Sequence, residues 1–351
     1  MGLPQVLIEF KAKAETAIRR SGNGAVALIL RDGTSDGTSY TYTNRAQVEK
    51  ADWTAANLEF ILQTFEGSPR RVLVERIGTS TKEKFEPALA RLRNKSWNYL
   101  AIPSIKESEC ADIAVWIIAQ RDLYRPFKAV LPHYAGGHEA IINFCTDEIR
   151  VKDKMYTAAA YCPRIAGLLA GLPMSESATY QVLPEVDSIL ESAVPDQDID
   201  AGKFILINDG VKVKVGRGIN SLTVLSGDKT EDMKKIKIIE GMDLMRTDIR
   251  STFEDNYVGL NNSYDNKVMF LAAINQYFAA LARQGALYES AENKAEIDIA
   301  AQQDWLEQKY DISDWTEDQI RQAKTGSIVF VTANVTFSDA IEDLRFRISM
   351  E

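Results

Sequence analysis

The sequence of 351 residues contains few of the side chains that most often carry out chemistry. It has two histidines and three cysteines, and Cys110, Cys145 and Cys162 lie far apart without the Cys-x-x-Cys spacing of a metal or redox site. We expect three reduced thiols in apolar surroundings. No stretch reaches the roughly 18 consecutive apolar residues of a membrane span, and residues 1–10 lack a charged and apolar leader. The sequence predicts a cytoplasmic protein without membrane insertion.

Positive charge and nucleotide-binding motifs are also scarce. Fifty acidic residues against 41 basic ones give a net charge of −9, which argues against nucleic acid as a partner. Neither a GxxxxGK[ST] loop nor a GxGxxG fingerprint is present, so we expect no nucleotide and no other cofactor. Asp196, Asp198 and Asp200 copy the first ligands of a calcium loop, but its twelfth position is Ile207 instead of glutamate. We expect a polar turn there and no metal.

One segment imitates the nucleophile elbow of a serine hydrolase. Residues 33–37 read Gly-Thr-Ser-Asp-Gly, but residues 38–43 are polar and β-prone where the elbow requires a helix. The only histidines, His133 and His138, lie in a predicted loop that contains glycine. The sequence therefore favours a protein that is not an enzyme. The competing interpretation is an unfamiliar α/β hydrolase with His133 or His138 as its base.

Strand-like and helix-like runs alternate through the first half of the chain. Apolar runs predict strands at 25–30, 71–77, 97–102 and 127–132. Apolar residues at helical spacing predict helices at 51–65, 82–92 and 110–119, and another beginning within 139–144. Such alternation implies crossover connections, and hence an α/β domain with a mainly parallel sheet.

The second half has a different pattern. Small and apolar residues predict a buried helix at 158–172, and Asn208-Asp209-Gly210 predicts a hairpin between strands at 204–207 and 211–215. A long amphipathic helix is expected at 228–253, with Asp228 and Glu231 in capping-box spacing at its start. The remaining expected elements are a buried helix at 266–282, a solvated acidic helical stretch at 289–324 and a strand at 327–333.

Both ends of the chain alternate like strands but lack a neighbouring hairpin partner. Near the start, the apolar positions are Val6, Ile8 and Phe10; near the end, they are Leu344, Phe346 and Ile348. Each strand must therefore pair with a distant segment, in its own fold or in another copy. The pattern alone favours an internal sheet closed by both ends, and a homodimer that swaps its ends is a further alternative.

Several segments together resemble a known family. They are residues 2–10 (GLPQVLIEF), 17–21 (AIRRS), 234–238 (KKIKI), 252–259 (TFEDNYVG), 264–267 (YDNK) and 337–344 (FSDAIEDL). With these segments, essentially the whole chain resembles a contractile tail sheath protein. The resemblance is closest to the short type found in bacteriophages and phage-tail-like bacteriocins of Gram-positive bacteria.

This resemblance implies a fold and a set of domain boundaries. Sheath proteins have an outer α/β domain and an α+β C-terminal domain that faces the tube, whose sheet is completed by the N- and C-terminal strands of neighbouring subunits. The corresponding segments here are an N-terminal arm at 1–20, an α/β domain at 21–225, a C-terminal domain at 226–342 and a C-terminal arm at 343–351. The apolar residues of the two arms are then the anchors of the exchanged strands.

The resemblance also implies a structural function. Such a chain polymerises helically around an inner tube and contracts from a metastable extended state, which drives the tube through a target membrane. Its partners are other copies of itself, the tube protein, and the baseplate and tail terminator proteins. It is assembled in the bacterial cytoplasm and becomes part of a tail or tail-like particle. As possible tube contacts we single out Lys294, Arg321 and Lys324, which lie in the acidic stretch.

Overall fold

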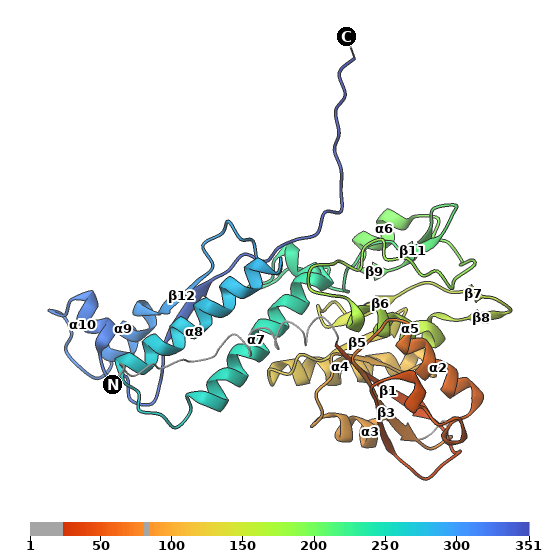
Figure 1. Cartoon of the computed structure of the whole chain (residues 1–351), viewed down its shortest axis with the longest axis horizontal. Coiled ribbons are helices and arrows are strands. Elements are labelled where there is room, and N and C mark those ends of the chain that lie inside the picture. Colours follow the sequence, from red (N-terminus) through yellow and green to blue (C-terminus); the bar gives the residue numbers. More distant parts are fainter. Residues whose placement is uncertain (1–23, 81–83, 351) are drawn as a thin grey trace, which may run out of the picture. The chain divides into compact units, whose positions relative to one another are not determined.

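The computed structural model describes residues 24–80 and 84–350. The chain divides into two compact units (Figure 1). The second unit comprises Gly241–Ser338, and the first comprises the other described residues, including the last ones, 339–350. Among the described residues, no helix is both long and apolar enough to cross a membrane.

A seven-stranded sheet forms the centre of the first unit. Its strands, in spatial order, are β2 (Ser39–Tyr42), β3 (Arg71–Ile77), β1 (Ala25–Arg31), β4 (Tyr99–Ala101), β5 (Lys128–Pro132), β6 (Ile141–Phe144) and β9 (Lys203–Phe204). Every neighbouring pair is parallel except β2 with β3. The predicted mainly parallel sheet is confirmed. The helix predicted to begin within 139–144 is wrong, because those residues form the buried strand β6.

Helices cover both faces of this sheet, which explains why β1 is apolar from Ala25 to Leu30. Val26, Leu28 and Leu30 belong to the core shared with α2 (Ala55–Phe65) and α5 (Ala158–Gly171). The alternate residues, such as Ala27 and Ile29, belong to the core shared with α3 (Glu86–Leu92) and α4 (Glu107–Asp122). A parallel strand buried on both faces has no polar side, as its sequence indicates.

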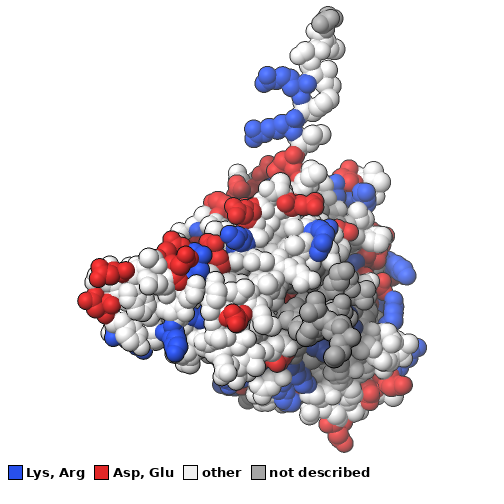
Figure 2. Space-filling view, turned by 60° about the vertical axis from the view of Figure 1, so that its left-hand side comes forward, with Lys and Arg blue, Asp and Glu red and all other residues white. Residues whose placement is uncertain are grey.

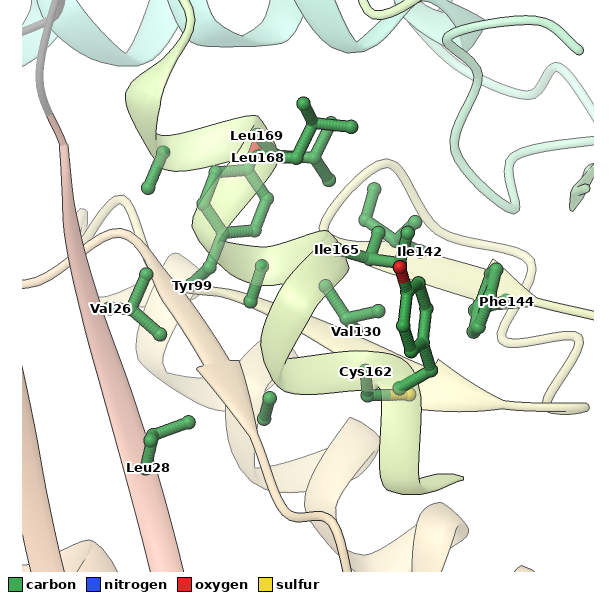
Figure 3. Close-up of a cluster of buried hydrophobic side chains, with 14 of the residues drawn as sticks. Val26, Leu28, Tyr99, Val130, Ile142, Phe144, Cys162, Ile165, Leu168 and Leu169 are labelled. Carbon is green, nitrogen blue, oxygen red and sulfur yellow. The ribbon is translucent and has the colours of Figure 1, made fainter. Parts of the chain in front are cut away.

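The predicted buried helix at 158–172 is confirmed as α5, which lies directly on the sheet. Figure 3 shows Cys162, Ile165 and Leu169 of this helix facing Val130 and Tyr99 of the strands below. Most of its residues are buried. Thr157 begins the helix, since its hydroxyl accepts a hydrogen bond from the amide of Ala160.

Smaller elements complete the first unit. They are the 3₁₀ turns η1 (Arg45–Gln47), η2 (Lys50–Asp52) and η3 (Glu231–Lys234), the hairpin β7 (Ile149–Val151) with β8 (Lys154–Tyr156), the short helix α6 (Pro195–Asp200), and β10 (Leu206–Asn208) with β11 (Val213–Val215). The antiparallel pairing of β10 with β11 confirms the predicted Asp-Gly hairpin. Gly210 has a φ of +89°, which glycine adopts without steric cost.

The second unit contains helices and a small sheet. Its elements are most of α7 (Ile236–Asn256), then α8 (Tyr264–Arg283), β12 (Lys294–Ile297), α9 (Ile299–Glu307), α10 (Glu317–Gln322) and β13 (Val331–Asn334). The helix expected at 266–282 is confirmed as α8. The predicted start at Asp228 is wrong, because residues 231–234 form η3 and Lys235 has an extended backbone before α7. The acidic stretch is only partly helical, since it contains β12.

Candidate subunit interface

The sheet of the second unit consists of β12 and β13 in antiparallel register among the described residues. The pairing continues beyond β13, where the amide of Tyr288 donates to the carbonyl of Thr336 (2.9 Å) and that of Ser338 donates to Ala286 (2.9 Å). Even-numbered residues between 330 and 338 therefore direct their backbone groups toward the β12 side. Because these groups alternate along a strand, the odd-numbered residues direct theirs to the opposite edge.

The outer edge of β12 is closed by one side chain of α8. The amide of Ala295 donates to Oδ1 of Asn275 (2.7 Å), and Nδ2 of Asn275 donates to the carbonyl of Ala295 (3.0 Å). One carboxamide thus replaces both hydrogen bonds that another strand would supply at this residue. We conclude that the outer edge of β12 cannot pair with a further strand at Ala295, because Asn275 already occupies its backbone groups.

The outer edge of β13 is open. The odd-numbered residues Val331, Ala333, Val335 and Phe337 direct their backbone groups there, and no other strand of the described chain lies along them. A row of unpaired amides and carbonyls on an exposed edge is a template for strand addition. The sheet therefore has one edge that can accept a strand.

An apolar groove of about 580 Å³ lies beside this edge. Its lining comes from α7 (Met242, Met245, Arg246, Ile249, Arg250 and Phe253), from α8 (Phe270), and from the β13 region (Val329, Val331, Val335 and Phe337). Apart from the two arginines, every lining side chain is apolar. An added strand could form backbone hydrogen bonds with the edge and place alternate apolar side chains in the groove.

The C-terminal segment has the properties of such a strand. Residues 339–350 form no helix or strand, and Figure 1 shows them as an extended trace. Leu344, Phe346 and Ile348 are 86%, 76% and 70% exposed, so the C-terminal alternation does not close a sheet formed by the described residues. Figure 2 shows basic side chains projecting to one side of this segment. They belong to the alternating positions Arg345 and Arg347.

Of the other predicted contact residues, the structure describes only the three basic ones. Val6, Ile8 and Phe10 lie outside the described residues. Nζ of Lys294 lies 3.3 Å from Glu296 on the same strand, and Arg321 contacts Glu317 (2.5 Å) one turn before it on α10. Lys324 is exposed. Among the described residues no recorded contact joins these three cations, and their role at a tube surface stays a prediction.

The segment that resembles a nucleophile elbow is a polar loop. It is followed by strand β2 instead of a helix, and Oγ of Ser35 lies 3.2 Å from the hydroxyl of Tyr40. Nε2 of His133 lies 2.6 Å from Asp147, whereas Nδ1 of His138 accepts a hydrogen bond from the amide of Ala140. Neither contact joins a histidine to the serine.

The predicted calcium-like turn and the cysteines also have structural explanations. Asp196, Asp198 and Asp200 lie in α6, where Asp198 forms an ion pair with Lys203 (2.6 Å). In the part of the chain that the structure describes, no cluster of three or more metal-ligating side chains occurs. Cys110 and Cys162 are buried, Cys145 is partly buried, and all three are free thiols, as predicted.

Two features of this region could not be found from the sequence. Asn275 contacts a strand twenty residues further along, and Asp343 contacts Arg217, which lies 126 residues earlier in the sequence. An isolated asparagine on a helix face carries no signal of such a contact. The alternating apolar residues at 344–348 are the only sequence signal of the interface among the described residues.

Comparison with known proteins identifies the family. Residues 228–351 match the family model described as phage tail sheath C-terminal domain. The tail sheath protein of Clostridium phage phiCD119 is similar over 360 residues at 36% identity, covering 99% of both chains.

Solved structures share the fold. The sheath tail protein from Listeria innocua has a TM-score of 0.69 at 16% identity, covering 84% of this chain and 93% of that one. The anti-feeding prophage helical sheath in its contracted state has a TM-score of 0.71 at 14% identity, covering 100% of both. Together with the full-length match to the phage protein, these findings show that the chain belongs to the phage tail sheath protein family.

Proposed function

We propose that this chain is a subunit of a contractile sheath that polymerises helically around an inner tube. Two features of the described chain carry the proposal: β13 has an open edge beside an apolar groove, and the C-terminal segment leaves its alternating apolar side chains exposed. Because one molecule carries both a strand to donate and an edge that can accept one, successive copies can be joined in a chain. The anti-feeding prophage sheath, which has a similar fold, is a helical assembly and so provides a precedent.

The proposed joint is an exchanged strand. Leu344, Phe346 and Ile348 of one copy enter the groove of another, and the backbone pairs with the odd-numbered residues of β13. Burial of each such side chain contributes about 1.5–3 kcal/mol, before the entropy of ordering the segment is subtracted. Because donor and acceptor are different surfaces, the contact is head-to-tail and can extend without closing.

Contraction is proposed to use energy stored during assembly. The sequence has no nucleotide-binding loop, which fits a kinetically trapped extended state that a trigger releases. In this proposal, subunits move outward largely as rigid bodies while the exchanged strands keep them connected, and the tube is driven through a target membrane. Contacts with the tube must be weak enough to break, for which the cations Lys294, Arg321 and Lys324 are candidates.

The tube, baseplate and tail terminator proteins are the expected partners, and one solved relative of this fold comes from the anti-feeding prophage baseplate. We propose that the sheath is assembled in the bacterial cytoplasm. We also propose that the N-terminal residues 4–11 form a second exchanged strand. Membership of a family of structural tail proteins confirms the prediction that the chain is not an enzyme.

Negative-stain electron microscopy of the purified chain tests this function. The full chain should form tubes or rings of regular helical order, whereas deletion of residues 344–351 should leave a folded monomer. Replacement of Arg345 and Arg347 by glutamine is a matched control, because it keeps every apolar anchor. Regular tubes from the deletion variant would contradict the proposed joint, and discrete dimers of the full chain would favour closed strand swapping.

A further inference from the structure

The C-terminal segment is fixed to the first unit immediately before its apolar residues begin. Three acids, Asp339, Glu342 and Asp343, contact the first-unit side chains Lys235, Arg217, Ser177 and Thr179. We call this set the polar latch. Both sides of the latch belong to the first unit, whereas the open edge of β13 belongs to the second.

The first contact of the polar latch is an ion pair between Asp339 and Lys235. Burial alone would raise the pKa of Asp339, but hydrogen bonds from Lys235 and from the amide of Ala340, with the nearby charge of Lys237, lower it overall. The carboxylate is therefore stabilised in its charged form at the point where the segment joins the first unit.

Glu342 forms the most buried contact. Its side chain is 10% exposed, and Oε1 accepts hydrogen bonds from the hydroxyls of Thr179 (2.5 Å) and Ser177 (3.0 Å). Nε of Arg217 lies 3.8 Å from the other carboxylate oxygen, and its Nη2 contacts Asp343 at 2.7 Å. One guanidinium thus joins two successive acids.

The surface that receives these acids is itself ordered by backbone pairing. The amide of Asn220 donates to the carbonyl of Lys234 (2.9 Å), and that of Ile236 donates to Gly218 (3.0 Å). Gly218 also allows a close approach, because a Cβ there would lie 3.1 Å from the side chains of Ala178 and Ser177. This backbone pairing therefore holds Arg217, Lys235 and the hydroxyls of Ser177 and Thr179 on one surface, where they contact the three acids.

The position of the polar latch matters because the same residues could otherwise form a turn. The link 338–343 joins the end of the β13 region to Leu344, and it is only slightly longer than common hairpin loops of about two to five residues. A hairpin here would bring Leu344, Phe346 and Ile348 onto the open edge of their own chain. In the structure, residues 339–343 instead form no turn and contact the first unit.

We propose that the polar latch prevents the C-terminal segment from closing on its own β13 edge and so directs it to a second copy. This inference rests on the proposed strand exchange. Arg217, Lys235, Ser177 and Thr179 act as positioning residues: they contact the base of the segment and leave its apolar anchors free. When the polar latch is released, the C-terminal segment can pair with the β13 edge of its own chain. Neither the segment nor the edge is then available to another copy, so polymerisation ends.

The test uses the full chain with Asp339→Asn and Glu342→Gln, which remove two charges with little change in shape. We expect at least a tenfold loss of sedimentable tubes and an unchanged circular dichroism spectrum. In the resulting monomer, hydrogen exchange should show protection of the amides of Val331, Ala333 and Val335. Lys234→Ala serves as a control, since this neighbouring lysine contacts Glu231 outside the latch.

A charge swap provides an independent test if the first variant does not fold. Lys235→Glu should abolish tubes, and adding Asp339→Lys should restore them, because the ion pair is rebuilt with reversed charges. Three results would overturn the proposed role of the polar latch. They are assembly of the latch variants like that of the unmodified chain, loss of assembly without protection of the β13 edge, and failure of the charge swap to restore tubes. Deletion of residues 344–351 distinguishes failure of the polar latch from failure of the strand exchange. If the deletion variant still forms tubes, the proposed strand exchange is wrong.

Discussion

Individual glycines determine how closely two helices of the first unit can approach. Gly167 lies in α5, and a Cβ added there would overlap the carbonyl oxygen of Thr64 in α2. Added Cβ atoms at Gly67 and Gly171 would likewise overlap the backbone of residues across the same contact. Because backbone atoms cannot rotate away as side chains do, this contact requires glycine.

Gly167→Ala is therefore expected to destabilise the first unit strongly. Overpacking of a tight core costs about 1–3 kcal/mol, and we expect the upper end of this range or more because the obstacle is backbone. Urea unfolding followed by circular dichroism would measure the loss. Gly33→Ala is the control, since its Cβ would approach only a methyl group of Thr79 at 3.3 Å. Equal stability of the two variants would contradict this explanation of the contact.

The cysteines give a prediction about pH. Burial raises the pKa of Cys110 to about 12 and that of Cys145 to about 11, from an ordinary value of 9.0. The folded state therefore binds these protons more tightly than the unfolded state. Their contribution to stability should be complete below pH 9 and decline as the pH rises from 9 toward 11. Urea unfolding at pH 8 and pH 10 would measure the change.

Thiol labelling checks the same claim. At pH 8 the folded chain should react slowly with Ellman's reagent, and the three thiols should react rapidly in denaturant. Rapid labelling of the folded chain at Cys110 would contradict the burial that raises its pKa. The sequence predicts buried thiols from their apolar neighbours, and the structure buries Cys110 and Cys162 fully and Cys145 partly.

At the scale of elements, periodicity predicted the long elements well and the short ones poorly. The β1 and β3 runs and the α5 and α8 helices were found because several consecutive residues repeat one pattern. The run at Ile141 and Ile142 was too short to distinguish a buried strand from a buried helix. β12 was missed because Ala295 and Ile297 are its only buried residues within an acidic stretch.

The closed edge of β12 gives a prediction for Asn275. Asn275→Ala leaves the amide and carbonyl of Ala295 without their side-chain partner, which costs about 1–3 kcal/mol if water does not replace it. Thermal unfolding would measure the loss. Gln276→Ala on the same helix is an exposed control and should have little effect. If the two variants unfold alike, Asn275 does not seal the edge.

The donor strand gives a second prediction at this scale. Phe346→Ala should weaken assembly at least tenfold, because it removes the largest apolar side chain of the proposed strand. The critical concentration for tube formation, measured by sedimentation, reports the change. Arg347→Ala is the adjacent control and should change it much less. A larger effect at Arg347 would mean that the opposite face of the strand contacts the acceptor.

At the scale of the whole molecule, the sequence predicted the family and the mainly parallel sheet, but not how the C-terminal end is used. Pattern alone favoured a terminal strand that closes its own sheet, whereas Leu344, Phe346 and Ile348 are exposed. Periodicity describes a strand but not its partner, because pairing depends on contacts distant in sequence. The acceptor edge and the polar latch are visible only in three dimensions.

Cryo-electron microscopy of tubes assembled from the full chain tests the central claim most directly. We expect residues 344–348 of a neighbouring copy to lie along the outer edge of β13, with Phe346 in the groove beside α7. Tubes in which that edge is vacant, or is occupied by the C-terminal segment of the same chain, would contradict it.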